Sequence, residues 1–159
     1  MSSYAEALKQ FYDGEVLGET VYSAMYAAAT NPAEKRKWAT LLQLETETKA
    51  WLRPHLVAQG VGVEEHTADR NRAIEIARPY VAMSWDRQMQ GMVDEVGQFV
   101  ATYQSFADEA EARGEAKAAA VCRHMVEHEK AQVAFARREL AGDTATSLEV
   151  ITPLLKYPI

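Results

Sequence analysis

Cysteine is nearly absent from this chain, in which Cys122 is the only one among 159 residues. A single cysteine cannot form an intrachain disulfide, so the sequence predicts a fold held by its core in a reducing cytoplasm. Basic residues are also scarce, because 17 Lys and Arg against 23 Asp and Glu give a formal net charge of −6. This acidic balance, without any Lys/Arg-rich tail, argues against a nucleic-acid partner.

Long apolar runs are missing as well. No stretch approaches the roughly 20 apolar residues that are needed to span a bilayer. The first residues, "MSSYAEALKQ", lack a basic segment followed by an apolar one, which is the pattern of a secretory signal. With 48% hydrophobic and 25% charged residues, the composition is that of a soluble globular domain. We therefore expect a cytoplasmic protein with no membrane partner.

The motifs of nucleophilic and phosphate chemistry are absent too. The chain has no Gly-x-Ser-x-Gly and no phosphate-binding glycine loop, and strand-like alternation appears only in "SLEVITPLL" near the end. What the sequence does contain is helical periodicity, broken by "TNP", "QGVG", Gly114 and "GD". It predicts long helices at about 4–29, 32–58, 87–112 and 115–141, and a short helix at 68–77 that ends before Pro79.

The order of these segments is a short loop, a long crossover and a second short loop. Two helical hairpins joined by one long connection are typical of one class of antiparallel four-helix bundle. We therefore predict an all-α four-helix bundle over residues 1–142, with a crossover that contains the short helix. Residues 143–159 are expected to form an extended tail packed on the bundle.

The two predicted hairpins resemble each other in sequence. An offset of 84 residues lays "LLQLETETKAWLRPHL" over "MVEHEKAQVAFARREL" and brings Glu45 onto Glu129. For the first and third long helices, an offset of 80 brings Glu15 onto Glu95. All four helices thus carry a glutamate at an equivalent position.

Each of these glutamates lies on the apolar stripe of its helix and at a similar distance from the hairpin turn. Glu129, for example, shares its stripe with Met125 and Ala136. A buried carboxylate is costly unless a cation, a hydrogen-bond partner or a metal ion compensates it. We therefore predict that Glu15, Glu45, Glu95 and Glu129 converge in the core around a metal.

With these positions, the chain resembles the ferritin-like proteins of the rubrerythrin and ferritin group. That family places a single Glu on each of two helices and a Glu-x-x-His on each of the other two, around a di-iron centre. The resemblance implies that Glu15 and Glu95 are the single glutamates, and that Glu45 and Glu129 begin the two Glu-x-x-His motifs. It covers nearly the whole chain up to Ala141.

The family's two histidines are replaced by Thr48 and Gln132 in "ETET" and "EKAQ". Carboxylate, amide and hydroxyl oxygens favour Mn, Mg or Ca, whereas imidazole favours Fe and Zn. Thr48 and Gln132 are expected to ligate weakly or to hydrogen-bond a neighbouring ligand. The implied cofactor is Fe or another divalent metal such as Mn or Zn, and the alternative is no metal at all.

Several other side chains lie near the predicted metal site. Glu19, one turn beyond Glu15, also faces inward and is a candidate fifth carboxylate, although a hydrogen-bonded glutamate at the edge of the core is the more common case. His128 lies about 100° around the helix from Glu129, at the boundary of the stripe, and His124 is expected to face solvent. Tyr22, Tyr26, Tyr103 and Phe106 are expected to line the core, with Tyr22 best placed to approach a metal.

Two classes of function follow from this pattern. The first is a metal-binding oxidoreductase or metal-handling protein that acts on metal ions or a small-molecule substrate. The second is a bundle without metal that serves as a binding or structural module. A DNA-protecting cage is disfavoured by the acidic charge. Apolar residues away from the inner stripes (Leu17, Val21, Val100 and Val133) are compatible with a homodimer.

Overall fold

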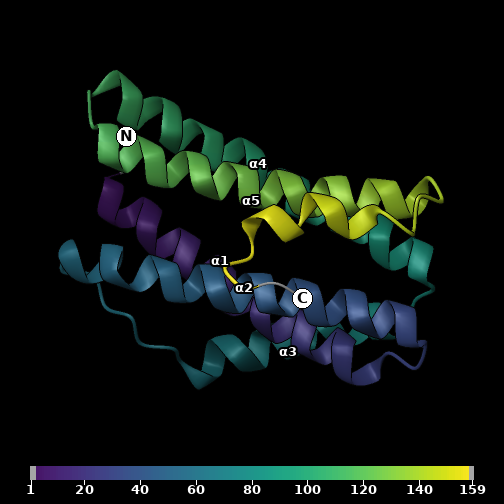
Figure 1. Cartoon of the computed structure of the whole chain (residues 1–159). Coiled ribbons are helices and arrows are strands. Elements are labelled where there is room, and N and C mark those ends of the chain that lie inside the picture. The colour runs from purple at the N-terminus through teal and green to yellow at the C-terminus, as the bar shows by residue number, and fades with distance from the viewer. Residues whose placement is uncertain (1–2, 158–159) are drawn as a thin grey trace.

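The structure is a computed structural model in which residues 3–157 are described, and over these residues it contains helices and turns but no strand. The all-helical prediction is therefore confirmed. Four long helices and one shorter helix make up most of the chain, followed by two short 3-10 helices (Figure 1). They are α1 (Tyr4–Ala28), α2 (Pro32–Ala58), α3 (Thr67–Val81), α4 (Trp85–Ala112), α5 (Ala116–Leu140), η1 (Ser147–Val150) and η2 (Thr152–Leu154).

Local sequence signals account for most of the helix ends. At the start of α1 the Ser3 hydroxyl accepts from the backbone N–H of Glu6, whose carboxylate accepts from Ser3 in return, which satisfies two otherwise unpaired N–H groups. At the start of α2, directly before Pro32, the Asn31 side-chain oxygen accepts from the backbone N–H groups of Ala33 and Glu34. Gly60, Gly114 and Gly142 have φ of 68°, 71° and 82° just beyond α2, α4 and α5, a conformation that favours glycine.

The third and fourth helices extend beyond their predicted limits. α3 continues past Pro79 to Val81, and α4 begins at Trp85 rather than at residue 87. A proline in the last turn of a helix removes only one backbone hydrogen bond. The Gln88 side-chain amide donates to the carbonyl oxygens of Tyr80 and Met83 at 3.0 and 3.2 Å, and this satisfies acceptors at the end of α3.

The tail is packed on the helices but is not extended. Residues 147–154 form the two 3-10 helices, in which the Ile151 side chain is fully buried against the cluster that contains Trp38 and Leu44. Further along, the Gln43 amide donates to the carbonyl oxygen of Tyr157 at 2.9 Å. Residues 158–159, the end of the predicted tail, lie outside the described part.

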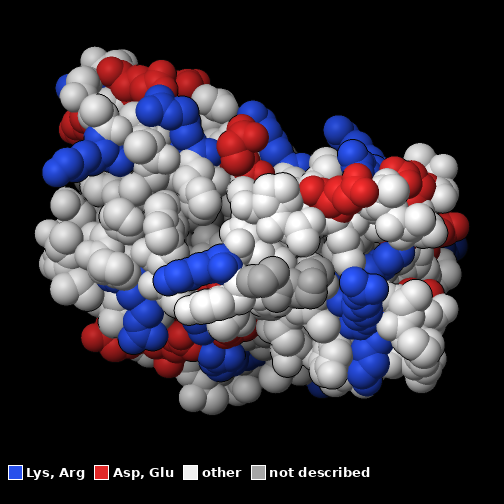
Figure 2. Space-filling model, viewed as in Figure 1, with Lys and Arg blue, Asp and Glu red and all other residues white. Residues whose placement is uncertain are grey.

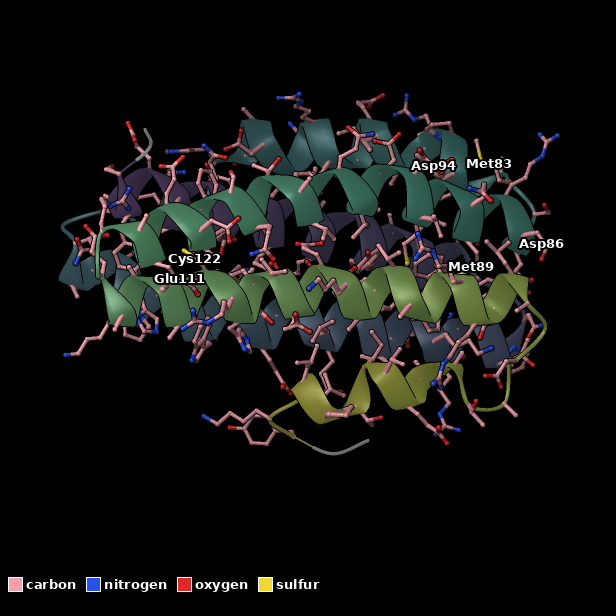
Figure 3. The ribbon with its side chains drawn as sticks, turned by 90° about the horizontal axis from the view of Figure 1, so that it is seen from above. Met83, Asp86, Met89, Asp94, Glu111 and Cys122 are labelled. Atoms are coloured by element: carbon pink, nitrogen blue, oxygen red, sulfur yellow. The ribbon has the colours of Figure 1, made fainter. Side chains whose placement is uncertain are left out.

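The long helices pair as two hairpins, α1 with α2 and α4 with α5. In Figure 1 the α4–α5 hairpin lies above the α1–α2 hairpin, and α3 lies below, where it packs on α1. Figure 3 shows α4 and α5 side by side, with Asp86 and Glu111 near opposite ends of α4 and the yellow tail along the outer side of α5. The core between the hairpins divides into two main apolar clusters, one around Phe11 and Met125 and the other around Trp38 and Phe135.

The surface carries charges of both signs. In the view of Figure 2, Lys and Arg side chains alternate with Asp and Glu, and no single sign covers the visible face. Over the described part of the chain, every helix is too short or too polar to cross a membrane.

Candidate metal centre

Buried ionisable side chains gather between the two main apolar clusters. Four of them are almost fully buried: Glu15 on α1 (1% exposed), Glu45 on α2 (3%), and His128 (1%) and Glu129 (6%) on α5. Three of the four carboxylates that the apolar stripes predicted to lie inside are therefore buried. They come from three helices, so folding of both hairpins is needed to bring them together.

These side chains are close enough to share one ion. Glu15, His128 and Glu129 each offer a ligand atom, and those atoms lie within 4.8 Å of one another. The His128 Nε2 atom is 3.4 Å from Glu15 Oε1 and 3.2 Å from Glu45 Oε1. Glu15 Oε2 is buried and has no hydrogen-bond partner. An unpaired buried carboxylate oxygen is costly, and a bound cation would remove that cost.

A chain of hydrogen bonds runs from α1 through α5 to α2 around this group. The Tyr22 hydroxyl donates to Gln132 Oε1, and the Gln132 amide nitrogen donates to Glu45 Oε1 at 2.9 Å. On the other side of the imidazole, Thr48 Oγ1 lies 3.2 Å from His128 Nδ1. Thr48 and Gln132, which were expected to ligate weakly or to hydrogen-bond a neighbouring ligand, thus hydrogen-bond to His128 and Glu45.

His128 Nε2 has more polar neighbours than it can satisfy. The Gln132 amide nitrogen lies 2.8 Å from it, in addition to the oxygens of Glu15 and Glu45. A neutral imidazole nitrogen is either a donor or an acceptor. If Nε2 accepts from Gln132, its single lone pair is directed at the amide and it offers nothing to the two carboxylates. If Nε2 instead carries a proton or binds a metal ion, it can no longer accept from Gln132, and the proton or the ion faces the carboxylates.

Burial and mutual repulsion shift the pKa values of these groups. Burial, followed by the nearby charges of Glu45 and Glu129, holds the pKa of Glu15 well above its usual range. Burial also raises the pKa of Glu129 to about 8, although His128 acts in the opposite direction. For His128, burial alone would lower the pKa, but the Glu45 and Glu129 carboxylates outweigh it and raise it. Without a metal, the cluster therefore retains protons at neutral pH.

The fourth predicted carboxylate, Glu95, is not buried with the others. It is exposed on α4, although it lines the same cavity as Glu45 and Glu129. Between Met92 and Tyr103, α4 has no buried side chain, since this part of the helix borders the cavity rather than a packed neighbour. The expectation that four buried carboxylates converge is therefore wrong for Glu95.

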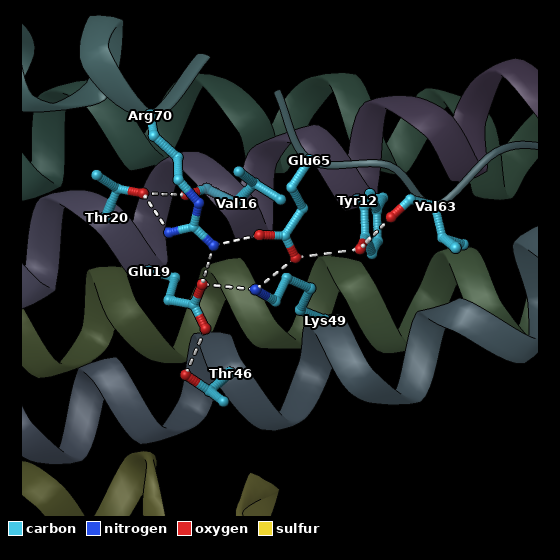
Figure 4. Close-up of polar contacts among 9 residues, drawn as sticks. All are labelled: Tyr12, Val16, Glu19, Thr20, Thr46, Lys49, Val63, Glu65 and Arg70. Atoms are coloured by element: carbon cyan, nitrogen blue, oxygen red, sulfur yellow. Dashed lines mark hydrogen bonds and ion pairs between the residues drawn. The ribbon is translucent and has the colours of Figure 1, made fainter. Parts of the chain in front are cut away.

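The structure also keeps Glu19 out of the cluster. Its carboxylate accepts from Thr46 at 2.8 Å and from Lys49 at 2.6 Å, and Arg70 lies 3.3 Å away (Figure 4). Burial alone would raise the pKa of Glu19, but the hydrogen bonds from Lys49 and Thr46 lower it. Lys49 and Arg70 also pair with Glu65 in the crossover, so Glu19 helps to fasten the crossover to α1 and α2.

We expect Glu19→Gln to leave metal stoichiometry unchanged and to lower the free energy of unfolding by about 1–3 kcal/mol, because Lys49 and Arg70 lose a charged acceptor. Urea unfolding and a metal titration of the same variant measure the two effects. A large loss of metal affinity would instead assign Glu19 to the ligands.

Two glycines of α1 leave room for polar groups of the opposing helices. A Cβ atom at Gly18 would lie 2.1 Å from Glu45 Oε2, and one at Gly14 would lie 2.8 Å from the Tyr103 hydroxyl. The two glycines of "GEVLGE" therefore allow close packing against α1. The packed groups are polar side chains, so Gly18 directly sets the position of the Glu45 carboxylate.

Gly18→Ala is expected to displace the Glu45 carboxylate and to weaken metal binding about tenfold or more, as loss of a ligand's supporting contact does. The free energy of unfolding should change little, because the higher helix propensity of alanine, worth up to about 1 kcal/mol, offsets the cost of displacing the Glu45 side chain. Gly97→Ala is the matched control, since nothing lies within 4 Å of a Cβ atom there. Equal metal affinities in the two variants would contradict the assigned role of Gly18.

His128, which was predicted to lie at the boundary of the apolar stripe, is fully buried. It belongs to a row of six buried residues on α5 whose sequence spacings alternate between four and three: Val121, Met125, His128, Gln132, Phe135 and Glu139. This seam was a usable signal, and it shows that α5 buries a wider arc than one stripe centred on Glu129. Tyr26, which was expected to line the core, is exposed by 39%.

The apolar residues that suggested a homodimer differ in burial. Val133 is buried, and Leu17, Val21 and Val100 are half-buried. Leu17 and Val21 line the cavity beside the cluster. The homodimer stays a prediction.

No family model matches this chain, and no curated protein or solved structure matches it either.

Proposed function

We propose that this chain is a ferritin-like metal-binding protein that holds one divalent transition metal between Glu15, His128 and Glu129, with Glu45 beside them. The observation that carries the proposal is the convergence of three ligand atoms within 4.8 Å of one another. The unpaired oxygen of Glu15 supports it. The hairpin order and the repeated glutamates support the ferritin-like assignment.

The donor set fits a transition metal. Carboxylate oxygens together with one imidazole nitrogen suit Fe, Mn or Zn better than Ca or Mg. His128 supplies the nitrogen donor that Thr48 and Gln132 do not. Thr48 contacts the other ring nitrogen, and such a contact fixes the tautomer and orientation of a metal-binding histidine.

The site we propose is smaller than the di-iron centre that the resemblance implies. A second metal would need further ligands, and the residue expected to supply one, Glu95, is exposed on α4. A redox-active metal at this position would supply electron-transfer or oxygen chemistry. The chain's own residues orient the ligands through Gln132 and Thr48 and surround them with apolar side chains.

The experiment is a titration of chelator-treated protein with Fe²⁺, Mn²⁺ and Zn²⁺, followed by elemental analysis after gel filtration. We expect about one tightly bound equivalent. Co²⁺ provides an independent readout, because its visible spectrum reports nitrogen ligation, and His128→Gln should change that spectrum. Absence of any bound metal in all of these titrations would overturn the proposal.

One observation favours a second candidate, a bundle without metal that serves as a binding or structural module. Tyr22, Gln132, Glu45, His128 and Thr48 already hydrogen-bond to one another. Protons retained on Glu15 and Glu129 would neutralise most of the remaining charge. In this case the protein purifies without metal and is not stabilised by added Fe²⁺, Mn²⁺ or Zn²⁺.

A further inference from the structure

A cavity of about 330 Å³ lies beside the carboxylate and imidazole groups, between α1, α3 and α4. Its volume is at the lower end of the range of small-molecule binding sites, which is roughly 300–1,000 Å³. Most of its wall is apolar and includes Leu17, Val21, Ile76, Met92 and Val96. An apolar wall binds the hydrocarbon part of a ligand without competing hydrogen bonds from ordered water.

One end of the cavity is polar. Tyr22, Glu45, Glu129 and Gln132 line it there, and these are the side chains of the proposed metal site and its hydrogen-bond network. A ligand that fills the cavity would therefore present one end to the cluster and keep the rest of its length among apolar side chains.

The other end reaches the surface. Ile76 on α3 and Phe99 on α4 both line the cavity, yet they are exposed by 38% and 37%. Both also line a second, more polar cavity of about 500 Å³. Large apolar side chains that are exposed at such a position are typical of an entrance for an apolar ligand.

Charge selects among the molecules that could enter. The second cavity is lined by Asp13, Glu64, Glu65 and Asp69, and Arg72 is the one basic side chain among the described residues that line either cavity. The inner cavity adds the carboxylates of Glu45, Glu95 and Glu129. The acidic side chains of the second cavity, together with Glu95, oppose the entry of an anionic head group.

We propose that this cavity binds a small, uncharged, mostly apolar molecule with a single hydrogen-bonding end group, of the class of medium-chain alcohols. The hydroxyl end lies at Glu129 and Gln132, and the hydrocarbon chain lies between α1, α3 and α4. This inference deepens the proposed function by naming its substrate class, and it rests on that function for the metal beside the polar end.

The test uses the full chain, with and without metal, and the probes 1-hexanol, 1-octanol and octanoate in calorimetric titrations. We expect saturable one-to-one binding of the alcohols. Each added methylene should tighten binding about threefold to fourfold until the cavity is full. In the metal-free protein, octanoate should bind at least about tenfold more weakly than 1-octanol, because the acidic side chains of the second cavity and Glu95 oppose it. Octanoate binding to the metal-free protein as tightly as 1-octanol, or an absence of saturable alcohol binding, would overturn the inference.

Val96→Phe fills the cavity and should weaken 1-octanol binding at least about tenfold, whereas Val57→Phe, at a residue exposed by 64%, should not. Leu17→Phe gives the same information if circular dichroism shows that Val96→Phe does not fold. Unchanged 1-octanol binding in a folded cavity-filling variant would contradict the assignment. Metal titration of the same samples separates the two proposals: alcohol binding without metal binding refutes only the metal site, and the reverse refutes only the ligand.

Discussion

Replacing Glu129 by alanine is expected to abolish stoichiometric metal binding, the largest effect of any single substitution in this chain. Glu129 is one of the three groups, Glu15, His128 and Glu129, whose ligand atoms lie within 4.8 Å of one another. The metal affinity should fall by more than the roughly 10–100-fold that follows when a metal ligand loses only a hydrogen-bond partner. Elemental analysis and a Zn²⁺ titration of the purified variant measure it.

The chain offers a control two residues away. Glu127 is exposed on the same helix and pairs with Lys130 at 3.0 Å. Glu127→Ala removes the same number of charges from α5, but it should leave metal content unchanged and alter stability by no more than about 0.5 kcal/mol. If Glu129→Ala retained one equivalent of metal, the centre would have to lie elsewhere.

The second large effect is a loss of stability of the metal-free protein as the pH rises from about 5 to 8. The pKa of Glu129 is about 8 in the folded state, against an ordinary value of 4.5. The folded protein therefore holds this proton more tightly than the unfolded chain. The resulting stabilisation is fully present below pH 4.5 and is lost as the pH rises toward 8. At about 1.4 kcal/mol per pKa unit, the loss amounts to a few kcal/mol.

Urea unfolding between pH 5 and 8 measures this dependence. Glu15, whose pKa is raised by burial and by its neighbours, acts in the same direction. Glu129→Gln should flatten the curve, because glutamine has no proton to lose, whereas Glu127→Gln should leave it unchanged. Added metal should oppose the loss, since metal ligands must be deprotonated to bind. A metal-free protein that becomes more stable over this interval would show that the cluster is not protonated.

Much of the fold could be predicted from helical periodicity and capping residues. Asn31 with Pro32, and the glycines at 60, 114 and 142, mark helix ends by local chemistry that does not depend on the rest of the chain. The end of α3 could not be found in this way. Gln88, which lies in the next helix, satisfies carbonyl groups there, and such a contact between elements is not visible in local sequence.

In the candidate site, too, some residues could be placed from local sequence and others depended on contacts between helices. Glu15, Glu45 and Glu129 could be placed inside because apolar residues flank each of them at helical spacing. Glu95 has similar flanking residues, but it borders a cavity, and periodicity alone cannot distinguish a packed neighbour from an empty volume. His128 was missed because the width of the buried arc of α5 depends on how α2 lies against it.

The way in which the two hairpins meet has a kinetic consequence. Helix backbones approach closely within each hairpin but seldom between them, so the hairpins are held together mainly by side chains. Contacts within a hairpin are local in sequence and form early, whereas contacts between hairpins form late. Glu15 and Glu45 belong to one hairpin and His128 and Glu129 to the other, so a bound ion would link the two hairpins. Because contacts between the hairpins are largely absent from the folding transition state, the ion would stabilise the folded state more than the transition state. Metal should therefore slow unfolding far more than it speeds folding, which stopped-flow measurements with and without Zn²⁺ would detect as a shift confined to the unfolding limb.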